Sequence, residues 1–343
     1  MTDSTIAPKA PRRKKRRSKR ARAAAHRVEF TLARSLERAV SLLPERAADR
    51  FGASIGRAIH GLGIRRETVD ENLRIAFPEK SSEWLARTRV AAYEHLGREA
   101  AAILRLSRLD ANAVIASTIV DGWDELQDAL SLGRGVILVT GHYGNWEIAA
   151  AAVAARGIPL GAIVRQQGNR LVDERLQQLR RNLGVETIYQ GQAPSRVPRL
   201  LRANGVVGIV GDQDARLRGV FVPFFGRLAS THRGPALFAL RLDAPVFSCI
   251  ARRLPGDEVR YEIRGRRVNF EPTGDVEADV YTLTAELSRR LEEDVRVAPE
   301  QYFWFHRRWK TRPSQEMNGG GVIPDQSESS PPTSGRPGSA IRR

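Results

Sequence analysis

Short apolar runs alternate with helical patterns between Gly135 and Asp294, and this alternation restricts the possible folds more than any other feature of the chain. The runs that read as strands are residues 135–140, 160–164, 186–189, 206–210, 244–251 and 260–263. Apolar residues recur at helical steps in 147–156, 171–183, 196–203, 233–242 and 279–294. Strands and helices in this order predict a single α/β domain with a mostly parallel central sheet flanked by helices.

Further helical patterns precede the sheet, at residues 28–43, 47–60, 65–76 and 82–106. The first two carry an apolar stripe among Glu and Arg residues, so they are amphipathic and cationic. Such helices suit a membrane surface. Packing of the same stripes on the α/β body is the alternative explanation.

The two ends of the chain differ from this body in composition. The net charge is +17, and eleven Lys or Arg with no acidic residue fall between Lys9 and Arg27, which leaves +6 for the rest. We predict a disordered basic arm at 1–27, a folded domain at 28–312, and a disordered tail rich in Gly, Pro and Ser at 313–343. The arm indicates an anionic partner, either nucleic acid, anionic phospholipid or a phosphorylated glycolipid.

Several sequence properties limit where the protein resides. No stretch reaches the ~18–20 uncharged apolar residues that span a bilayer, and no apolar segment follows the basic start as in a secretory signal. The single cysteine, Cys249, excludes an internal disulfide framework, and its apolar surroundings predict a small buried side chain rather than a nucleophile. We expect the protein in the cytoplasm or at its membrane boundary.

His142 is the leading candidate for chemistry. The apolar run 135–140 enters a glycine-bounded turn that displays this histidine before a helix begins, and active sites of open α/β sheets lie beyond the carboxyl ends of strands. Asn145 is a candidate N-cap, which places Glu147 in the first helical turn. A carboxylate there could hold the imidazole in one tautomer and stabilise its protonated form. The alternative is a structural turn histidine beside a glutamate that complements the helix dipole.

Polar residues also follow two other expected strands. Arg165 follows the run 160–164, while Asp212 and Asp214 follow the run 206–210. An arginine at this edge of the sheet could hold a phosphate or a developing oxyanion. Paired acids could orient a base, bind a metal or cap a turn. The spacing of these residues with His142 supports a metal site poorly, and no metal is predicted.

Blocks of this sequence resemble the lipid A biosynthesis acyltransferases, the lauroyl and myristoyl transferases related to the glycerol-phosphate acyltransferase fold. They occur in order over residues 32–310: 141–147, with the family's His-x4-Asp/Glu motif; Arg165 with 169–173; 211–214; 222–226; and 299–310. The resemblance implies a glycerol-phosphate-acyltransferase-like fold, a fatty acyl transfer reaction, and no metal or other cofactor.

The resemblance also implies roles for individual residues. His142 would act as general base, taking a proton from an acceptor hydroxyl as it attacks the thioester of acyl carrier protein or coenzyme A, and Glu147 would orient it. Arg165, Asp212 and Asp214 would bind substrate, and either aspartate could instead orient the histidine. The acceptor would be a lipid A precursor at the cytoplasmic face of the inner membrane.

One departure from the family changes the expected attachment. Family members commonly carry an N-terminal transmembrane anchor, whereas the matching segment here is charged, so we expect peripheral or monotopic binding to an anionic membrane surface through the arm and the first helices. Alternative functions are acylation of a phosphatidylinositol mannoside or another glycolipid, and thioester hydrolysis by the same dyad. A non-enzyme alternative is a protein that grips nucleic acid with the basic arm and the aromatic-cationic stretch 302–310; the resemblance argues against that partner.

Overall fold

The computed structural model describes residues 19–256 and 258–313. Met1–Thr311 form one compact unit and Arg312–Arg343 another, of which only the first two residues are described. Most of the expected basic arm and nearly all of the expected tail therefore lie outside the described residues. Residues 19–27, which we expected to be disordered, instead begin helix α1 (Lys19–Leu42).

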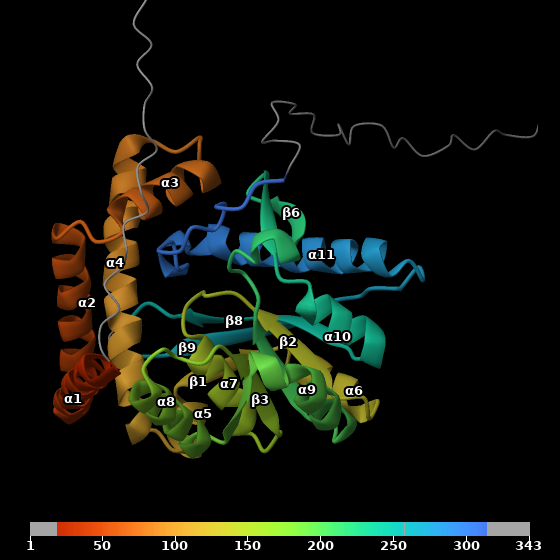
Figure 1. Ribbon diagram of the computed structural model, residues 1–343, viewed down its shortest axis with the longest axis horizontal. Helices are drawn as coiled ribbons and strands as arrows, with labels where there is room; N and C mark the ends of the chain where they lie inside the picture. The colour runs from red at the N-terminus through yellow and green to blue at the C-terminus, as the bar shows by residue number, and fades with distance from the viewer. Residues whose placement is uncertain (1–18, 257, 314–343) are drawn as a thin grey trace, which may run out of the picture. The chain divides into compact units, whose positions relative to one another are not determined.

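A seven-stranded sheet of order β1-β9-β8-β2-β5-β3-β4 forms the centre of the domain (Figure 1). Its strands are β1 (Thr118–Asp121), β2 (Val136–Thr140), β3 (Leu160–Val164), β4 (Val185–Tyr189), β5 (Val206–Val210), β8 (Val246–Arg253) and β9 (Tyr261–Arg267). Neighbouring strands are parallel except for β8 and β9. The predicted α/β domain with a mostly parallel sheet is confirmed.

Helices cover both faces of this sheet, because its central strands are apolar on both faces. On β2, Val136 and Leu138 face one side of the sheet. They pack there in a cluster with residues of α5 (Ala111–Ala116), α6 (Trp123–Ser131) and α7 (Trp146–Ala154). The alternate residues Ile137 and Val139 pack on the opposite side with α9 (Ala193–Arg202), α10 (Gly234–Leu242) and α11 (Val276–Val297). Helix α8 (Arg170–Asn182) packs against β4 at the edge of the sheet.

Residues 220–231 form an antiparallel hairpin of β6 (Val220–Phe224) with β7 (Arg227–Thr231), apart from the central sheet. Pro223 is tolerated because the two-stranded ribbon leaves its other edge unpaired. Short 3-10 turns complete the described elements: η1 (Leu106–Arg108), η2 (Gln190–Gln192), η3 (Arg216–Arg218) and η4 (Pro299–Gln301).

Helices α2 (Glu45–Gly61), α3 (Arg66–Ala76) and α4 (Ser82–Arg105) form a helical layer with α1 beside the sheet (Figure 1). α3 and α4 bury their apolar faces against the segment 299–309. The contact forms an aromatic cluster, and Tyr302, Trp304 and Trp309 are buried within it. They are therefore core residues and cannot stack on nucleic-acid bases, which removes one support for the nucleic-acid alternative.

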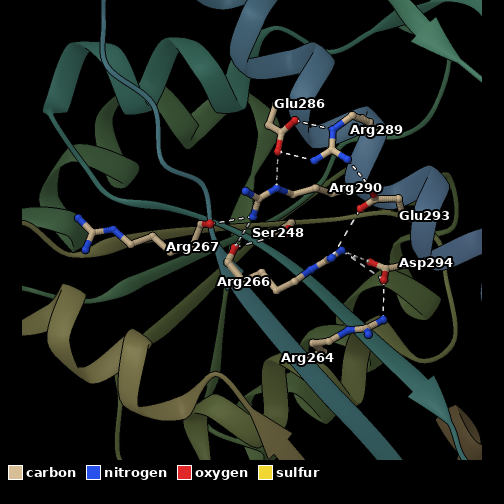
Figure 2. Close-up of polar contacts among 9 residues, drawn as sticks. All are labelled: Ser248, Arg264, Arg266, Arg267, Glu286, Arg289, Arg290, Glu293 and Asp294. Carbon is tan, nitrogen blue, oxygen red and sulfur yellow. Dashed lines mark hydrogen bonds and ion pairs between the residues drawn. The ribbon is translucent and has the colours of Figure 1, made fainter.

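A network of ion pairs attaches α11 to β9 (Figure 2). Arg264 and Arg266 both bind the buried carboxylate of Asp294, at 2.5 and 3.3 Å. Arg290 binds Glu286 at 2.6 Å and donates to the carbonyl oxygen of Arg267 at 2.7 Å. The network fixes the helix that leads directly into the segment 299–309, and this segment packs against the turn after β2.

Candidate active site

The register of two neighbouring strands brings His142 and Asp212 together. β2 and β5 are parallel, and Thr140 is paired with Val210. His142 and Asp212 each lie two residues beyond this pair, so they leave the sheet side by side. Nδ1 of His142 lies 2.6 Å from Oδ1 of Asp212, and the main-chain N–H of His142 donates to Oδ2 at 2.9 Å. Asp212 is therefore the acid that holds the imidazole.

The environment of the pair favours an ionised Asp212 and a basic His142. Burial disfavours the protonated imidazole, but the charge and hydrogen bond of Asp212, with a smaller contribution from Glu147, outweigh it and raise the pKa of His142. Burial likewise disfavours the Asp212 carboxylate, and His142 outweighs this effect, so the pKa of Asp212 is lowered. The ring nitrogen facing Asp212 is best occupied by a proton, which leaves Nε2 free to accept one.

Glu147 occupies a different position from the one expected. It lies in the first turn of α7, and Asn145 caps that helix, as the sequence predicted. Its two carboxylate oxygens accept hydrogen bonds from the Arg180 guanidinium, at 2.9 and 2.5 Å. Asp212, and not the expected Glu147, thus accepts the hydrogen bond of the imidazole, because Arg180, a largely buried cation on α8, takes Glu147 as its counter-ion.

A cavity of about 870 Å³ opens beside His142 on the α7 face of the sheet. Its floor is apolar and consists of small or aliphatic residues of the strands and of α7. These are Leu138, Leu160, Ala162, Gly208, Cys249, Ala149 and Ala150. Arginines from several elements line the same cavity: Arg165, Arg180, Arg216 and Arg218. A second cavity, behind Asp212, measures about 40 Å³ and is too small for a fatty chain.

The other predicted site residues also reach this cavity. Arg165 follows β3, which is paired with β5, so it lies at the same edge of the sheet as Asp212. Asp214 lines the cavity as well. One of its oxygens accepts from the Thr311 hydroxyl at 3.0 Å, and within the described ranges the other is buried without a partner. Four of the five predicted residues, His142, Glu147, Arg165 and Asp214, thus line one cavity, and Asp212 lies behind His142 in contact with its ring.

The turn that carries His142 is fixed by main-chain contacts on both sides. The carbonyl of His142 accepts from Phe303 N at 2.9 Å, and Gly144 N donates to the carbonyl of Gln301 at 2.9 Å. Gly144 has a φ of +54°, and a Cβ there would lie 1.8 Å from the carbonyl oxygen of Ala251. Only glycine allows this close approach, so the strand β8 and the C-terminal segment together define where the imidazole sits.

Buried polar contacts also join this turn to the helical layer. Asn145 uses Oδ1 to cap α7 and Nδ2 to donate to Glu99 of α4 at 2.8 Å. Glu99 further accepts from the Tyr261 hydroxyl at 2.8 Å and from Arg253 at 2.9 Å. All the polar groups of this buried carboxylate and amide are therefore matched, and Glu99 supports the turn from behind.

We expect the Asn145–Glu99 pair to tolerate an exchange of amide and carboxylate between the two positions better than a substitution at one position alone. Asn145→Asp sets a second carboxylate against Glu99 and should lower the free energy of unfolding by about 1–3 kcal/mol, together with turnover. Adding Glu99→Gln restores one donor and one acceptor, and should recover most of both quantities. Urea denaturation and steady-state kinetics measure them. Glu94→Gln is the matched control, because Glu94 lies on the same helix and pairs only with Arg57 among the ion pairs of α2 and α4 described here; a double variant no better than Asn145→Asp would contradict the pairing.

Sequence reasoning did not identify Arg180, Glu99 or Gln213 as site residues. Arg180 and Glu99 are charged residues inside amphipathic helices, where their sequence context is that of an ordinary solvent-facing side chain. Gln213, whose amide nitrogen lies 3.4 Å from Nε2 of His142, is adjacent to Asp212, so its position beyond β5 was the available signal. His306 lies with its ring centroid 6.4 Å from that of His142, and burial lowers its pKa.

Two global features of the described residues bear on the chemistry. No cluster of three or more His, Cys, Asp or Glu that could hold a metal ion occurs in the ranges 19–256 and 258–313. Over the same part of the chain, no helix is both long and apolar enough to cross a membrane.

The sequence model of the bacterial lipid A biosynthesis acyltransferases matches residues 14–311, and the chain belongs to this family. It is 28% identical over 274 residues to the lipid A biosynthesis lauroyltransferase of Escherichia coli (strain K12), a match that covers 79% of this chain and 88% of the relative. The lipid A biosynthesis myristoyltransferase of the same organism is 25% identical over 287 residues, covering 81% and 85%. A phosphatidylinositol mannoside acyltransferase of Mycolicibacterium smegmatis is 26% identical over 281 residues, covering 79% and 88%.

Family membership makes the chain an acyltransferase. Relatives named for lipid A and for phosphatidylinositol mannoside support transfer to a glycolipid.

Proposed function

We propose that this enzyme transfers a fatty acyl chain from a thioester of acyl carrier protein or coenzyme A to a hydroxyl of a lipid A precursor. The observation that carries the proposal is the His142–Asp212 pair at the wall of the 870 Å³ cavity. A basic imidazole nitrogen at one end of a cavity with an apolar floor suits deprotonation of an alcohol beside a fatty chain. The arginines around it suit a substrate with phosphate groups.

The proposed reaction needs only the residues on this chain and the two substrates. Nε2 of His142 takes the proton of the acceptor hydroxyl as its oxygen attacks the thioester carbonyl. Asp212 holds Nδ1–H and stabilises the imidazolium that forms. The tetrahedral intermediate then expels the thiolate, which takes the proton from the imidazolium and leaves as thiol. An ester bond forms, a thioester bond breaks, and His142 returns to its neutral state.

Arg165 and Asp214 are proposed substrate-binding residues. Arg165 lines the cavity and could hold a phosphate of either substrate or the developing oxyanion. Asp214 lines the cavity, and a carboxylate there is suited to accept a hydrogen bond from a sugar hydroxyl. Glu147 acts in this scheme by holding Arg180 at the cavity wall and by adding to the negative potential at His142.

Purified enzyme tests the proposal with defined substrates. A phosphorylated lipid A precursor and a phosphatidylinositol mannoside are offered separately with acyl carrier protein or coenzyme A thioesters, and products are read by mass spectrometry. We expect the lipid A precursor to gain one acyl chain. Acylation of the mannoside alone would assign the alternative acceptor. Free fatty acid as the main product in the presence of either acceptor would indicate a thioesterase and contradict the transferase.

We also propose that α1 binds the enzyme peripherally to the anionic cytoplasmic face of the inner membrane. Val28, Leu32 and Leu36 lie along one side of this helix and are 60%, 66% and 40% exposed. Exposed arginines flank them, among them Arg27 and Arg38. An apolar stripe with cationic borders fits the headgroup boundary of an anionic bilayer.

Contacts between α1 and α8 connect the proposed membrane helix to the cavity. Asn169, the N-cap of α8, donates to the carbonyl of His26 at 2.9 Å and to Glu29 at 2.9 Å. Arg175 of α8 donates to Glu37 at 3.1 Å. The loop between Arg165 and Asn169 thus connects the cavity rim to the proposed membrane helix, so a lipid acceptor has a short path from the bilayer.

A double substitution, Leu32→Glu with Leu36→Glu, should reduce binding to anionic phospholipid vesicles by at least about tenfold, because each leucine contributes its burial in the bilayer. Vesicle flotation measures the bound fraction, and transfer in detergent should stay close to wild type. Ile119→Glu, at a 49% exposed residue of the sheet edge, is the control. Undiminished flotation of the double variant would contradict the proposed membrane face.

A further inference from the structure

We infer that Gly208 is a specificity-determining residue that makes room for the acyl chain, and that the size of the side chain at this position sets which chain lengths the enzyme accepts. This inference rests on the proposed function. Gly208 is the middle residue of β5, between β2 and β3 in the centre of the sheet, and it lines the cavity beside His142. A glycine inside a central strand weakens the strand, so it calls for a local reason.

The usual structural reasons for a glycine do not apply at this position. Its φ lies outside the left-handed region that favours glycine, and an added Cβ would meet only Cδ2 of Leu160, at 4.0 Å. Gly161 on the adjacent strand is different, because its Cβ would lie 2.7 Å from Ile188 and Leu200 side-chain atoms. Gly161 is a packing glycine, whereas the space above Gly208 is open. An open space over a strand glycine is typical of a place where a ligand approaches the backbone.

The register of the sheet extends this open space into a row of apolar residues across the strands. Gly208 is paired with Ala162 on one side and with Leu138 on the other. Both neighbours line the cavity, as do Ala149 and Ala150 of α7. At the distal end of β3, Leu160 lines it too, four residues before Val164 at the edge that carries the site. At about 3.3 Å per residue, this apolar floor is ~13 Å long.

The direction of this floor matches what an acyl donor requires. The carbonyl of the thioester must lie at His142, beyond the carboxyl end of β2, and the chain must extend away from it. The apolar floor runs from that edge down the strands, and three of the cavity arginines come from the segments that follow β3 and β5 at the edge: Arg165, Arg216 and Arg218. The polar part of the substrates therefore meets the arginines, while the chain passes over Gly208.

Side chains of increasing size at position 208 should shorten the accepted chain. Each methylene excluded from an apolar site costs about fourfold in kcat/KM. We expect Gly208→Ala to lower the ratio of kcat/KM for tetradecanoyl over hexanoyl thioesters by about fourfold, and Gly208→Leu to lower it by about 100-fold. Turnover of the hexanoyl thioester should change little, because a short chain ends before it reaches this residue.

The experiment uses the full chain, acyl carrier protein and coenzyme A thioesters from butanoyl to hexadecanoyl, and the acceptor that the wild type acylates. Gly61→Ala is the control, because a Cβ there meets nothing within 4 Å and the residue lies on α2, away from the cavity. Ala150→Leu on α7 tests the same row if Gly208→Leu does not fold. An equal loss for short and long chains, or an unchanged ratio in all folded variants, would overturn the inference. A wild type that transfers no chain from any thioester would instead refute the proposed function.

Discussion

Replacing His142 by alanine should lower kcat/KM for acyl transfer by ~10²–10⁴-fold, the usual contribution of a general base. The reason is that Asp212 holds His142 at the cavity wall as a base, whereas burial lowers the pKa of His232, the other histidine that lines the cavity among the described residues. His306 donates a hydrogen bond from Nδ1 to the carbonyl oxygen of Phe303 at 2.9 Å, and its lowered pKa makes it a poor base. Product formation by mass spectrometry, at saturating and limiting acceptor, measures the effect.

The control for this substitution is His60→Ala. His60 lies on α2 and packs against Tyr93, far along the chain from the cavity residues, and it should leave kcat/KM near the wild-type value. Thermal unfolding checks that both variants are folded. Near-wild-type turnover in His142→Ala, or an equal loss in both variants, would remove His142 from its proposed role.

Asp212→Asn should lower the rate and also change its pH dependence. His142 must be neutral to accept a proton, so kcat/KM should rise as pH increases through its pKa, which Asp212 holds above the ordinary value of roughly 6.5. Without the carboxylate, burial dominates and the pKa falls, which moves the acidic limb to lower pH. The plateau should fall by up to about 10⁴-fold, since the imidazolium formed in the reaction loses its counter-ion and its tautomer is no longer fixed.

Glu147→Gln distinguishes the effect of Glu147 on the pKa of His142 from that of Asp212. Glu147 makes the smaller contribution to the raised pKa, so this variant should shift the acidic limb in the same direction but by less. Rates at a series of pH values, with the same acceptor and donor, give the acidic limb of each variant. A larger shift in Glu147→Gln than in Asp212→Asn would contradict the arrangement in the structure.

The identity of the orienting acid could not be read from local sequence. His142 was identifiable because an apolar run, a glycine-bounded turn and a helix start follow one another within a short segment. Asp212 is 70 residues further along the chain, and its contact depends on β5 lying beside β2. The sheet order inserts β5 between β2 and β3, and a single sequence specifies strand positions better than strand neighbours. Glu147, close in sequence, was therefore the natural expectation.

The same limit explains which strands were predicted. The buried central strands β2, β3 and β5 are continuous runs of aliphatic residues, and their positions follow from composition alone. β1 is four residues long at the edge of the sheet with an exposed Ile119, and its pairing with β9 supplies the hydrogen bonds that define it. The hairpin β6–β7 contains a proline and reverses at Phe225 and Gly226, both at positive φ. Such elements depend on tertiary contacts more than on local pattern.

Nuclear magnetic resonance titration of the histidine side chains in the full-length enzyme examines the His142–Asp212 pair without relying on turnover. The resonance of His142 is assigned by its absence in His142→Ala. We expect it to titrate above about 6.5 in the wild type and below that value in Asp212→Asn, with Nδ1 protonated and Nε2 bare in the neutral wild-type ring. A His142 that titrates below its ordinary value in the wild type, or that titrates identically in Asp212→Asn, would show that Asp212 does not hold the imidazole and would remove the basis of the proposed catalysis.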